Sequence, residues 1–207
     1  MGTILDKLIK IELFTDYVWP WCYLSTVRVE KLKKSHNVKV KLVHFPLHPD
    51  TPIEGQSLKQ MFGPGKDIDE MNRKMKALME NEGLAYNNRD MTYNSRLAQE
   101  LGSWADTQLN GENIHNSIYE SYFVHQKNIA EKQVLIDIAI NLGFDELKIN
   151  EVLENRTFEK QVDADWSKAR NMGVTGVPTF VAGGAALVGA QPYEAIVDLI
   201  NNAQNQN

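Results

Sequence analysis

Two strand-like segments with a helical segment between them occupy most of the first 45 residues. Residues 8–14 are apolar with two charged interruptions, which predicts a strand near a sheet edge, and residues 38–45 alternate with the period of a second strand. Pro20 suits the first turn of a helix, because its missing N–H leaves no bond unmade there, and this helix is expected to end near Ser35. A strand, helix and strand of this size form the unit that connects parallel strands.

The rest of the chain divides into a helical stretch and a second strand-rich stretch. Residues 46–65 contain four prolines and are expected to hold little regular structure. Apolar side chains then recur at helical spacing, which predicts an α-helical core. Two short strand-like runs surround Gly183-Gly184 within residues 178–188, as in a hairpin. A last amphipathic helix is expected over residues 193–200, before a polar tail that we expect to fray.

This order of elements predicts one α/β sheet domain that is interrupted by a helical insertion. We assign residues 1–62 and 165–207 to the sheet domain, and residues 63–164 to the inserted α-helical domain. With 207 residues, the chain is long enough to bury a sizeable core in this arrangement.

Composition and charge narrow the classes of partner. The sequence is 43% hydrophobic and 24% charged, as in ordinary soluble globular proteins, and its net charge of -5 gives no attraction to phosphate backbones or anionic lipid. Residues 1–10 lack the apolar core and cleavage site of a secretory signal, and no stretch approaches the roughly 20 apolar residues that span a bilayer. We therefore expect a cytoplasmic protein with no nucleic-acid or membrane partner. Whether it forms a homodimer stays open.

Residues 19–22 read Trp-Pro-Trp-Cys and fall where the first predicted strand gives way to the helix. A thiol-disulfide enzyme uses two cysteines at this spacing, because the first attacks as a thiolate and the second displaces the mixed disulfide. Here Trp19 fills the attacking position, and Cys22 is the only cysteine in the sequence. A helix N-terminus lowers the pKa of an exposed thiol, whereas a sulfur that is turned inward is an inert core residue. The sequence leaves both interpretations of Cys22 open.

A second informative pair, Val177-Pro178, begins the late strand-rich stretch. A cis bond at this place would aim the N–H and C=O of Val177 outward to pair with an extended substrate, although only about 5–6% of X–Pro bonds in folded proteins are cis. Trp19 is interpreted either as a ligand contact that stacks or donates one hydrogen bond, or as an apolar plug against the helical domain. His44 and His48 lack the spacing of metal ligands on a helix, so we expect no metal site.

Four stretches resemble the DsbA family of thioredoxin-fold proteins. Residues 14–24, with Phe14, Asp16 and Pro-Trp-Cys-Tyr-Leu, look like its active-site segment, and they are similar to the FrnE-like branch of predicted dithiol-disulfide isomerases, which carries Cys-Pro-Trp-Cys-Tyr there. Phe-Pro-Leu-His-Pro-Asp from residue 45, Tyr-Glu-Ser-Tyr-Phe from residue 119 and Gly-Val-Thr-Gly-Val-Pro-Thr-Phe from residue 173 agree with the same family in the right order.

The resemblance implies a thioredoxin fold with an inserted all-helical domain and a cis Pro178 beside the active-site helix. It also implies a substrate groove between the two domains. The candidate residues in contact with substrate are Pro20, Trp21, Tyr23, Val177 and Pro178, and the candidate catalytic residues are Cys22 and Trp19.

Two related branches, the kappa-class glutathione transferases and the 2-hydroxychromene-2-carboxylate isomerases, place a serine at the attacking position and bind glutathione in the same groove. Trp19 departs from both patterns. The resemblance implies a thiol-disulfide oxidoreductase or isomerase that is limited to monothiol chemistry at Cys22, acts on a small thiol or a protein thiol, and requires no cofactor. Two alternatives stay open: a glutathione-dependent isomerase or transferase, and a non-catalytic module that binds a peptide or small molecule.

Overall fold

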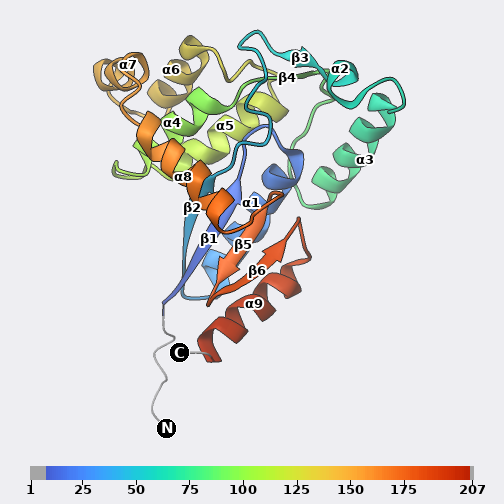
Figure 1. The fold of residues 1–207 in the computed structure, drawn as a ribbon, viewed down its shortest axis with the longest axis vertical. Helices are drawn as coiled ribbons and strands as arrows, with labels where there is room; N and C mark the ends of the chain where they lie inside the picture. The colour runs from blue at the N-terminus through green and yellow to red at the C-terminus, as the bar shows by residue number, and fades with distance from the viewer. Residues whose placement is uncertain (1–7, 206–207) are drawn as a thin grey trace.

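The computed structural model describes residues 8–205 and has a four-stranded mixed sheet at its centre (Figure 1). The strand order is β2-β1-β5-β6, in which β1 runs parallel to β2 and antiparallel to β5, and β5 runs antiparallel to β6. The four strands are β1 (Ile9–Thr15), β2 (Val38–His44), β5 (Thr179–Ala182) and β6 (Ala185–Val188). The predicted parallel unit and the late hairpin are both present.

Helix α1 (Pro20–Ser35) connects the parallel strands β1 and β2, as the sequence predicts. The predicted edge position of β1 is wrong, because β1 lies between β2 and β5. The charged residues of β1 suggested an edge strand exposed to water. Glu12 instead forms an ion pair with Lys168 of α8 (Glu159–Asn171), so a helix packed on the sheet supplies its partner.

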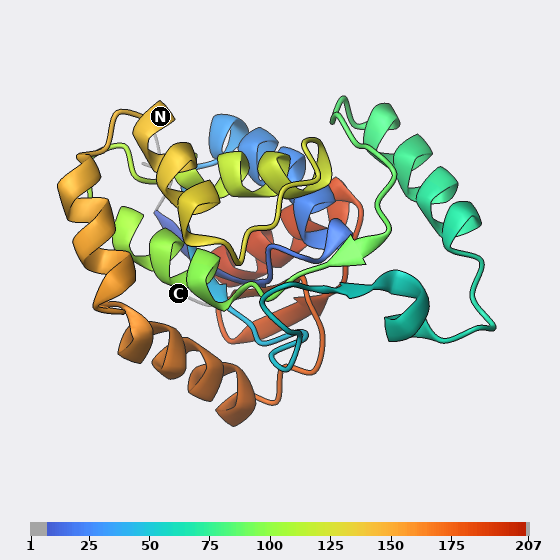
Figure 2. The ribbon, with the colours of Figure 1, turned by 90° about the horizontal axis from the view of Figure 1, so that it is seen from above.

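Helices cover both faces of the sheet (Figure 2). On one face, the apolar side chains of β1 and β5 pack against α1 and α9 (Tyr193–Asn205). On the other face lies α8, whose Asp165 accepts a hydrogen bond from the backbone N–H of His44 at 3.1 Å. Helix α8 runs across the predicted domain boundary at residue 165 and connects the helical domain to the sheet.

The remaining helices gather mainly at the end of the sheet where α1 begins (Figure 1). They are α2 (Leu58–Phe62), α3 (Ile68–Asn81), α4 (Arg96–Ala105), α5 (Asn113–Phe123), α6 (Lys132–Asn141) and α7 (Glu146–Glu154), with a small sheet of β3 (Gln56–Ser57) and β4 (Met91–Thr92). One large core spans both parts of the molecule, because residues of α1 and of the helical domain belong to the same apolar cluster.

Of two local expectations, one is confirmed and one needs correction. Residues 46–65 hold little regular structure, namely the short β3 and α2, and α2 begins with a capping box in which Ser57 and Gln60 exchange hydrogen bonds. The polar tail does not fray from residue 201, since α9 continues to Asn205 and buries Ala203. A Cβ at Gly183 would lie 2.6 Å from the Cβ of Ala203, so the hairpin turn packs directly on this last turn of helix.

Candidate functional site

The Trp-Pro-Trp-Cys segment forms the first turn of α1, directly after the loop that follows β1. Trp19 is the N-cap residue with extended dihedral angles, and its C=O accepts the N–H of Cys22 at 3.0 Å. Its indole makes no capping hydrogen bond and packs, half-buried, against the main core. The side chain at the attacking position is therefore an apolar contact between the helix start and the core.

Cys22 is buried, with 2% of its surface exposed. Burial raises the pKa of its thiol from the usual 9.0 to about 12. A hydrogen bond with the Thr15 side chain and one with the Asp16 backbone lower this pKa, while the charge of Asp16 raises it further. The helix N-terminus thus does not produce an activated thiol, because desolvation dominates.

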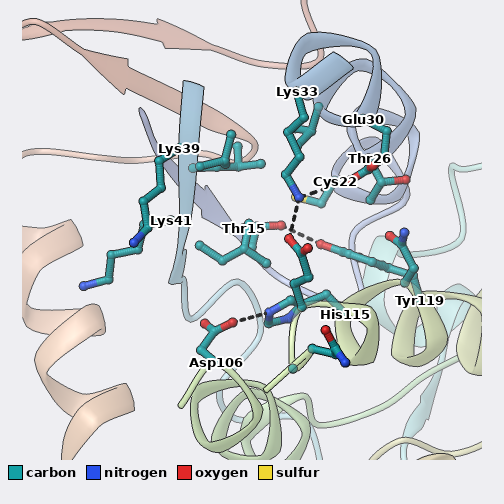
Figure 3. Close-up of a pocket in the computed structure, with 18 of the residues that line it drawn as sticks. Thr15, Cys22, Thr26, Glu30, Lys33, Lys39, Lys41, Asp106, His115 and Tyr119 are labelled. Atoms are coloured by element: carbon teal, nitrogen blue, oxygen red, sulfur yellow. Dashed lines mark hydrogen bonds and ion pairs between the residues drawn. The ribbon is translucent and has the colours of Figure 1, made fainter. Parts of the chain in front are cut away.

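Cys22 lines a pocket of about 530 Å³, here called the α1 pocket, whose walls come from α1, β1, β2 and the segment that leads into α5 (Figure 3). At its inner end, the Thr15 hydroxyl lies 2.5 Å from the Tyr119 hydroxyl. At its outer side, Lys33 of α1 contacts Glu112 at 2.9 Å and Glu30 at 3.2 Å. The pocket has the size of a small-molecule site, and its lining mixes apolar side chains with charged ones, of which Lys33 is already paired.

A buried polar chain lies next to the α1 pocket. The Tyr17 hydroxyl lies 2.6 Å from Nδ1 of His115, and Nε2 of His115 lies 2.9 Å from the carboxylate of Asp106. Because the carboxylate can only accept, we assign the His115 proton to Nε2, and Tyr17 then donates to Nδ1. Burial, with the charges of Asp106 and Asp16, raises the pKa of Tyr17 well above its usual value, so this hydroxyl stays protonated and acts as a donor. Sequence reasoning missed this chain, whose members are far apart and match no motif.

The Val177–Pro178 peptide bond is cis. Within residues 8–205, neither the N–H nor the C=O of Val177 makes a hydrogen bond, although the flanking groups do: Thr179 donates to Gly176 O at 2.7 Å, and Gly189 donates to Pro178 O at 2.7 Å. The Val177 side chain is buried in the main core. Its backbone is therefore a pair of hydrogen-bonding groups that the described protein leaves unused.

The structure does not bring all the predicted site residues to one cavity. Cys22 lines the α1 pocket, but Trp19, Val177 and Pro178 do not. Trp21 is half-buried against the main core, and Pro20 is buried.

Tyr23, predicted to contact substrate, instead lies in the core. It is 2% exposed, its ring stacks on Phe123 at a centroid distance of 5.2 Å, and its hydroxyl donates to Ala85 O at 3.2 Å. A position on the inward face of α1, one residue after Cys22, leaves it no surface for a ligand.

Within the described part of the chain, no group of three or more histidine, cysteine or acidic residues is placed to hold a metal ion. None of the helices described between residues 8 and 205 is long and apolar enough to cross a membrane.

The family description "DSBA-like thioredoxin domain" matches residues 10–201, which is most of the chain. This protein belongs to the DsbA-like thioredoxin-domain family. The structure is similar to that of a probable DsbA oxidoreductase from Streptomyces coelicolor, with a TM-score of 0.89, 25% sequence identity, and coverage of 96% of this chain and 91% of that one. The predicted family and the predicted thioredoxin fold with a helical insertion are therefore confirmed.

Two further relatives cover nearly the whole chain. The structure of a 2-hydroxychromene-2-carboxylate isomerase has a TM-score of 0.75 at 15% identity and covers 96% of this chain and 97% of its own, which shows a shared fold. The Bacillus subtilis protein YwbO, described as uncharacterized, is 23% identical over 206 residues, 96% of this chain and 98% of YwbO. The DsbA-like family of this chain thus contains thiol oxidoreductases, and its fold is shared with an isomerase.

Proposed function

We propose that this DsbA-like protein binds a peptide-like thiol of the glutathione class and does not exchange disulfides through its own sulfur. The observation that carries the proposal is the burial of Cys22, whose pKa lies at about 12. At pH 7 such a thiol is ionised in about one molecule in 10⁵, against about one in 10² at the usual pKa of 9.0. A monothiol mechanism needs that thiolate at the surface, where a second thiol can reach the mixed disulfide.

Trp19 also supports the proposal that the protein does not exchange disulfides through its own sulfur. An indole supplies neither a thiolate nor a hydroxyl, so the attacking position of this chain carries no nucleophile and no donor of the serine type. Any thiol chemistry at the start of α1 must then use a sulfur that the ligand brings, while the protein contributes binding and orientation.

Two sets of unused backbone groups suit such a ligand. The N–H and C=O of Val177 are unpaired in the described protein and are the pair with which an extended peptide forms a short ladder. In the first turn of α1, Pro20 has no N–H, and the N–H of Trp21 has no partner among the described residues. A thiolate is favoured near such a helix N-terminus by its free amide and its dipole.

Insulin reduction with dithiothreitol tests the redox half of the proposal. We expect the wild type and Cys22→Ser to show the same rate, close to that of dithiothreitol alone. Trp19→Cys restores the two-cysteine spacing and is expected to raise the rate, with Trp19→Ser as its matched control. A wild-type rate above background that Cys22→Ser abolishes would instead support a monothiol oxidoreductase.

Thermal unfolding with 5 mM glutathione tests the binding half. A ligand whose dissociation constant is about a tenth of that concentration raises the melting temperature of a chain of this size by about 3 °C or more. S-methylglutathione keeps the peptide but blocks the sulfur, so a smaller shift with this compound would show that the thiol contributes. If neither compound changes the melting temperature, the proposed ligand class is wrong.

A further inference from the structure

Arg89, between α3 and β4, is a buried cation in the helical domain. The residue is 7% exposed, and its guanidinium lies over the rings of Tyr122 and Phe123, 5.3 Å from each centroid. One terminal nitrogen donates to the Tyr122 hydroxyl at 2.5 Å. The Asn72 side chain donates to the Arg89 C=O at 2.9 Å, so the backbone is held in place as well.

This buried charge has no acidic partner within the described chain. Other arginines, such as Arg96 and Arg156, form ion pairs with carboxylates, but Arg89 lies within 4 Å of none among residues 8–205. Burial acts to lower the pKa of Arg89, and its interactions with Tyr122 and Tyr86, neither of them a carboxylic acid, raise it. Its Nε is buried and has no hydrogen-bond partner among residues 8–205. An arginine in this state is unusual, because a buried cation normally has a compensating anion.

A cavity of about 230 Å³, here called the Arg89 cavity, lies at this place. It is lined by Arg89, by the aromatic residues Tyr93 and Tyr122, and by the amide residues Asn88 and Gln126. Gln126 has a φ of 55°, in the left-handed region that residues other than glycine rarely adopt, and its side chain donates to the C=O of Asn88. The cavity thus combines one cation, one acidic residue (Asp90), amide groups and aromatic walls.

His48 lies close enough to Arg89 for the positive charge of the guanidinium to affect its imidazole. Burial is the larger cause that lowers the pKa of His48, and the positive charge of Arg89 lowers it further. The Nε2 atom of His48 is also buried without a hydrogen-bond partner in the described part of the chain.

We propose that the Arg89 cavity binds a small carboxylate that is carried on an aromatic or other apolar body. The carboxylate would accept hydrogen bonds from the guanidinium and remove the uncompensated buried charge, while Tyr93 and Tyr122 contact the body of the ligand.

The chemistry of the lining favours a carboxylate over a phosphate. The cavity offers one positive group, and the exposed acidic residue Asp90 is also part of its lining, so a ligand with one negative charge suits it better than a ligand with two. A planar carboxylate matches the planar guanidinium. The volume is below the roughly 300 Å³ at which sites for drug-sized ligands begin, which limits the ligand to the size of a monocyclic acid.

Benzoate and benzamide form a matched pair of probes, because they have the same shape and differ in charge. In thermal unfolding of the full chain, we expect 10 mM benzoate to raise the melting temperature by about 3 °C or more. This is the shift for a ligand whose dissociation constant is about a tenth of that concentration. Benzamide should give no shift. Equal shifts with both probes, or none with either, would overturn the proposal, and a larger shift with phosphate than with benzoate would overturn the choice of carboxylate.

Two variants localise the effect. Arg89→Met removes the charge and keeps much of the volume, and it is expected to abolish the benzoate shift. Arg73→Met, at an exposed arginine of α3, is the matched control and should keep that shift. If Arg89→Met does not fold, chemical-shift changes of the wild-type amides decide the question, because benzoate must then perturb residues 88–91 and 126. Glutathione stabilisation should survive Arg89→Met, so this site and the proposed function fail independently.

Discussion

The reaction of Cys22 with a thiol reagent tests the geometry of α1 most directly. The perturbation is chemical modification of the native protein by 5,5'-dithiobis(2-nitrobenzoate), compared with the protein unfolded in urea. Since Cys22 is the only cysteine in the sequence, the whole signal reports one sulfur. Burial sets the expected result, because it both raises the pKa of the thiol and limits access to it.

The magnitude follows from the two pKa values. A rise from 9.0 to about 12 lowers the thiolate population near neutral pH about 10³-fold. A more basic thiolate is also a better nucleophile, which at a Brønsted coefficient of about 0.45 returns a factor of about 20. The intrinsic rate should therefore fall about 50-fold. Because only 2% of Cys22 is exposed, the reagent must also wait for a local opening, and the observed rate falls further.

We therefore expect the native rate constant at pH 8 to be at least about 50-fold below that of the unfolded chain. Leu147→Cys in a Cys22→Ser background is the control, because residue 147 lies on α7 and is 81% exposed. This cysteine should react at nearly the same rate in the folded and unfolded states. A native Cys22 that reacts within about fivefold of the unfolded chain, with a midpoint below pH 8, would refute the burial argument and return the monothiol mechanism.

Three further predictions concern stability and are measured by urea unfolding. Burial raises the pKa of Asp16 from 3.8 to about 6, so the folded state binds this proton more tightly, and the free energy of unfolding should increase by up to about 2.5 kcal/mol as the pH falls from 7 to 4. Asp16→Asn should remove this contribution, and an unchanged dependence of the free energy of unfolding on pH would contradict it. Glu100→Gln leaves Arg156 without the buried carboxylate that it contacts at 2.5 Å and should lower the free energy of unfolding by about 2–3 kcal/mol. A decrease below about 0.5 kcal/mol, as for an exposed ion pair, would contradict this prediction. Gly102→Ala places a Cβ 2.3 Å from the Tyr17 hydroxyl and should destabilise the protein by about 1–2 kcal/mol despite the better helix propensity of alanine; a stabilised variant would show that this contact relaxes easily.

The elements that the sequence predicts well are those with local signals. Pro20 marks the start of α1, and α1 ends at Ser35, where it is expected to end. The run of alternating residues forms β2, and Gly183-Gly184 forms the turn between β5 and β6. Each of these depends on neighbouring residues, so a single sequence contains the information.

The predictions that failed depend on distant contacts. Strand β1 lies inside the sheet because β5, from the end of the chain, pairs with it, and Glu12 then meets Lys168, which is 156 residues away. The side chain of Cys22 points inward, next to Thr15 and Tyr119, which contact each other although they are 104 residues apart. No local pattern reports either contact, so a sequence motif can place Cys22 on the first turn of α1 but cannot say which way its sulfur points.

This difference bears on what the presence of Cys22 means. Cys22 packs among apolar side chains of the main core and is hydrogen-bonded to Thr15, so it has a structural role that does not need a second thiol. A tryptophan at residue 19 leaves that packing intact while it removes the attacking group. The single cysteine is therefore weak evidence for redox activity. The backbone of Val177 and the charge of Arg89, which have no partner of their own kind within residues 8–205, are better guides to what the protein binds.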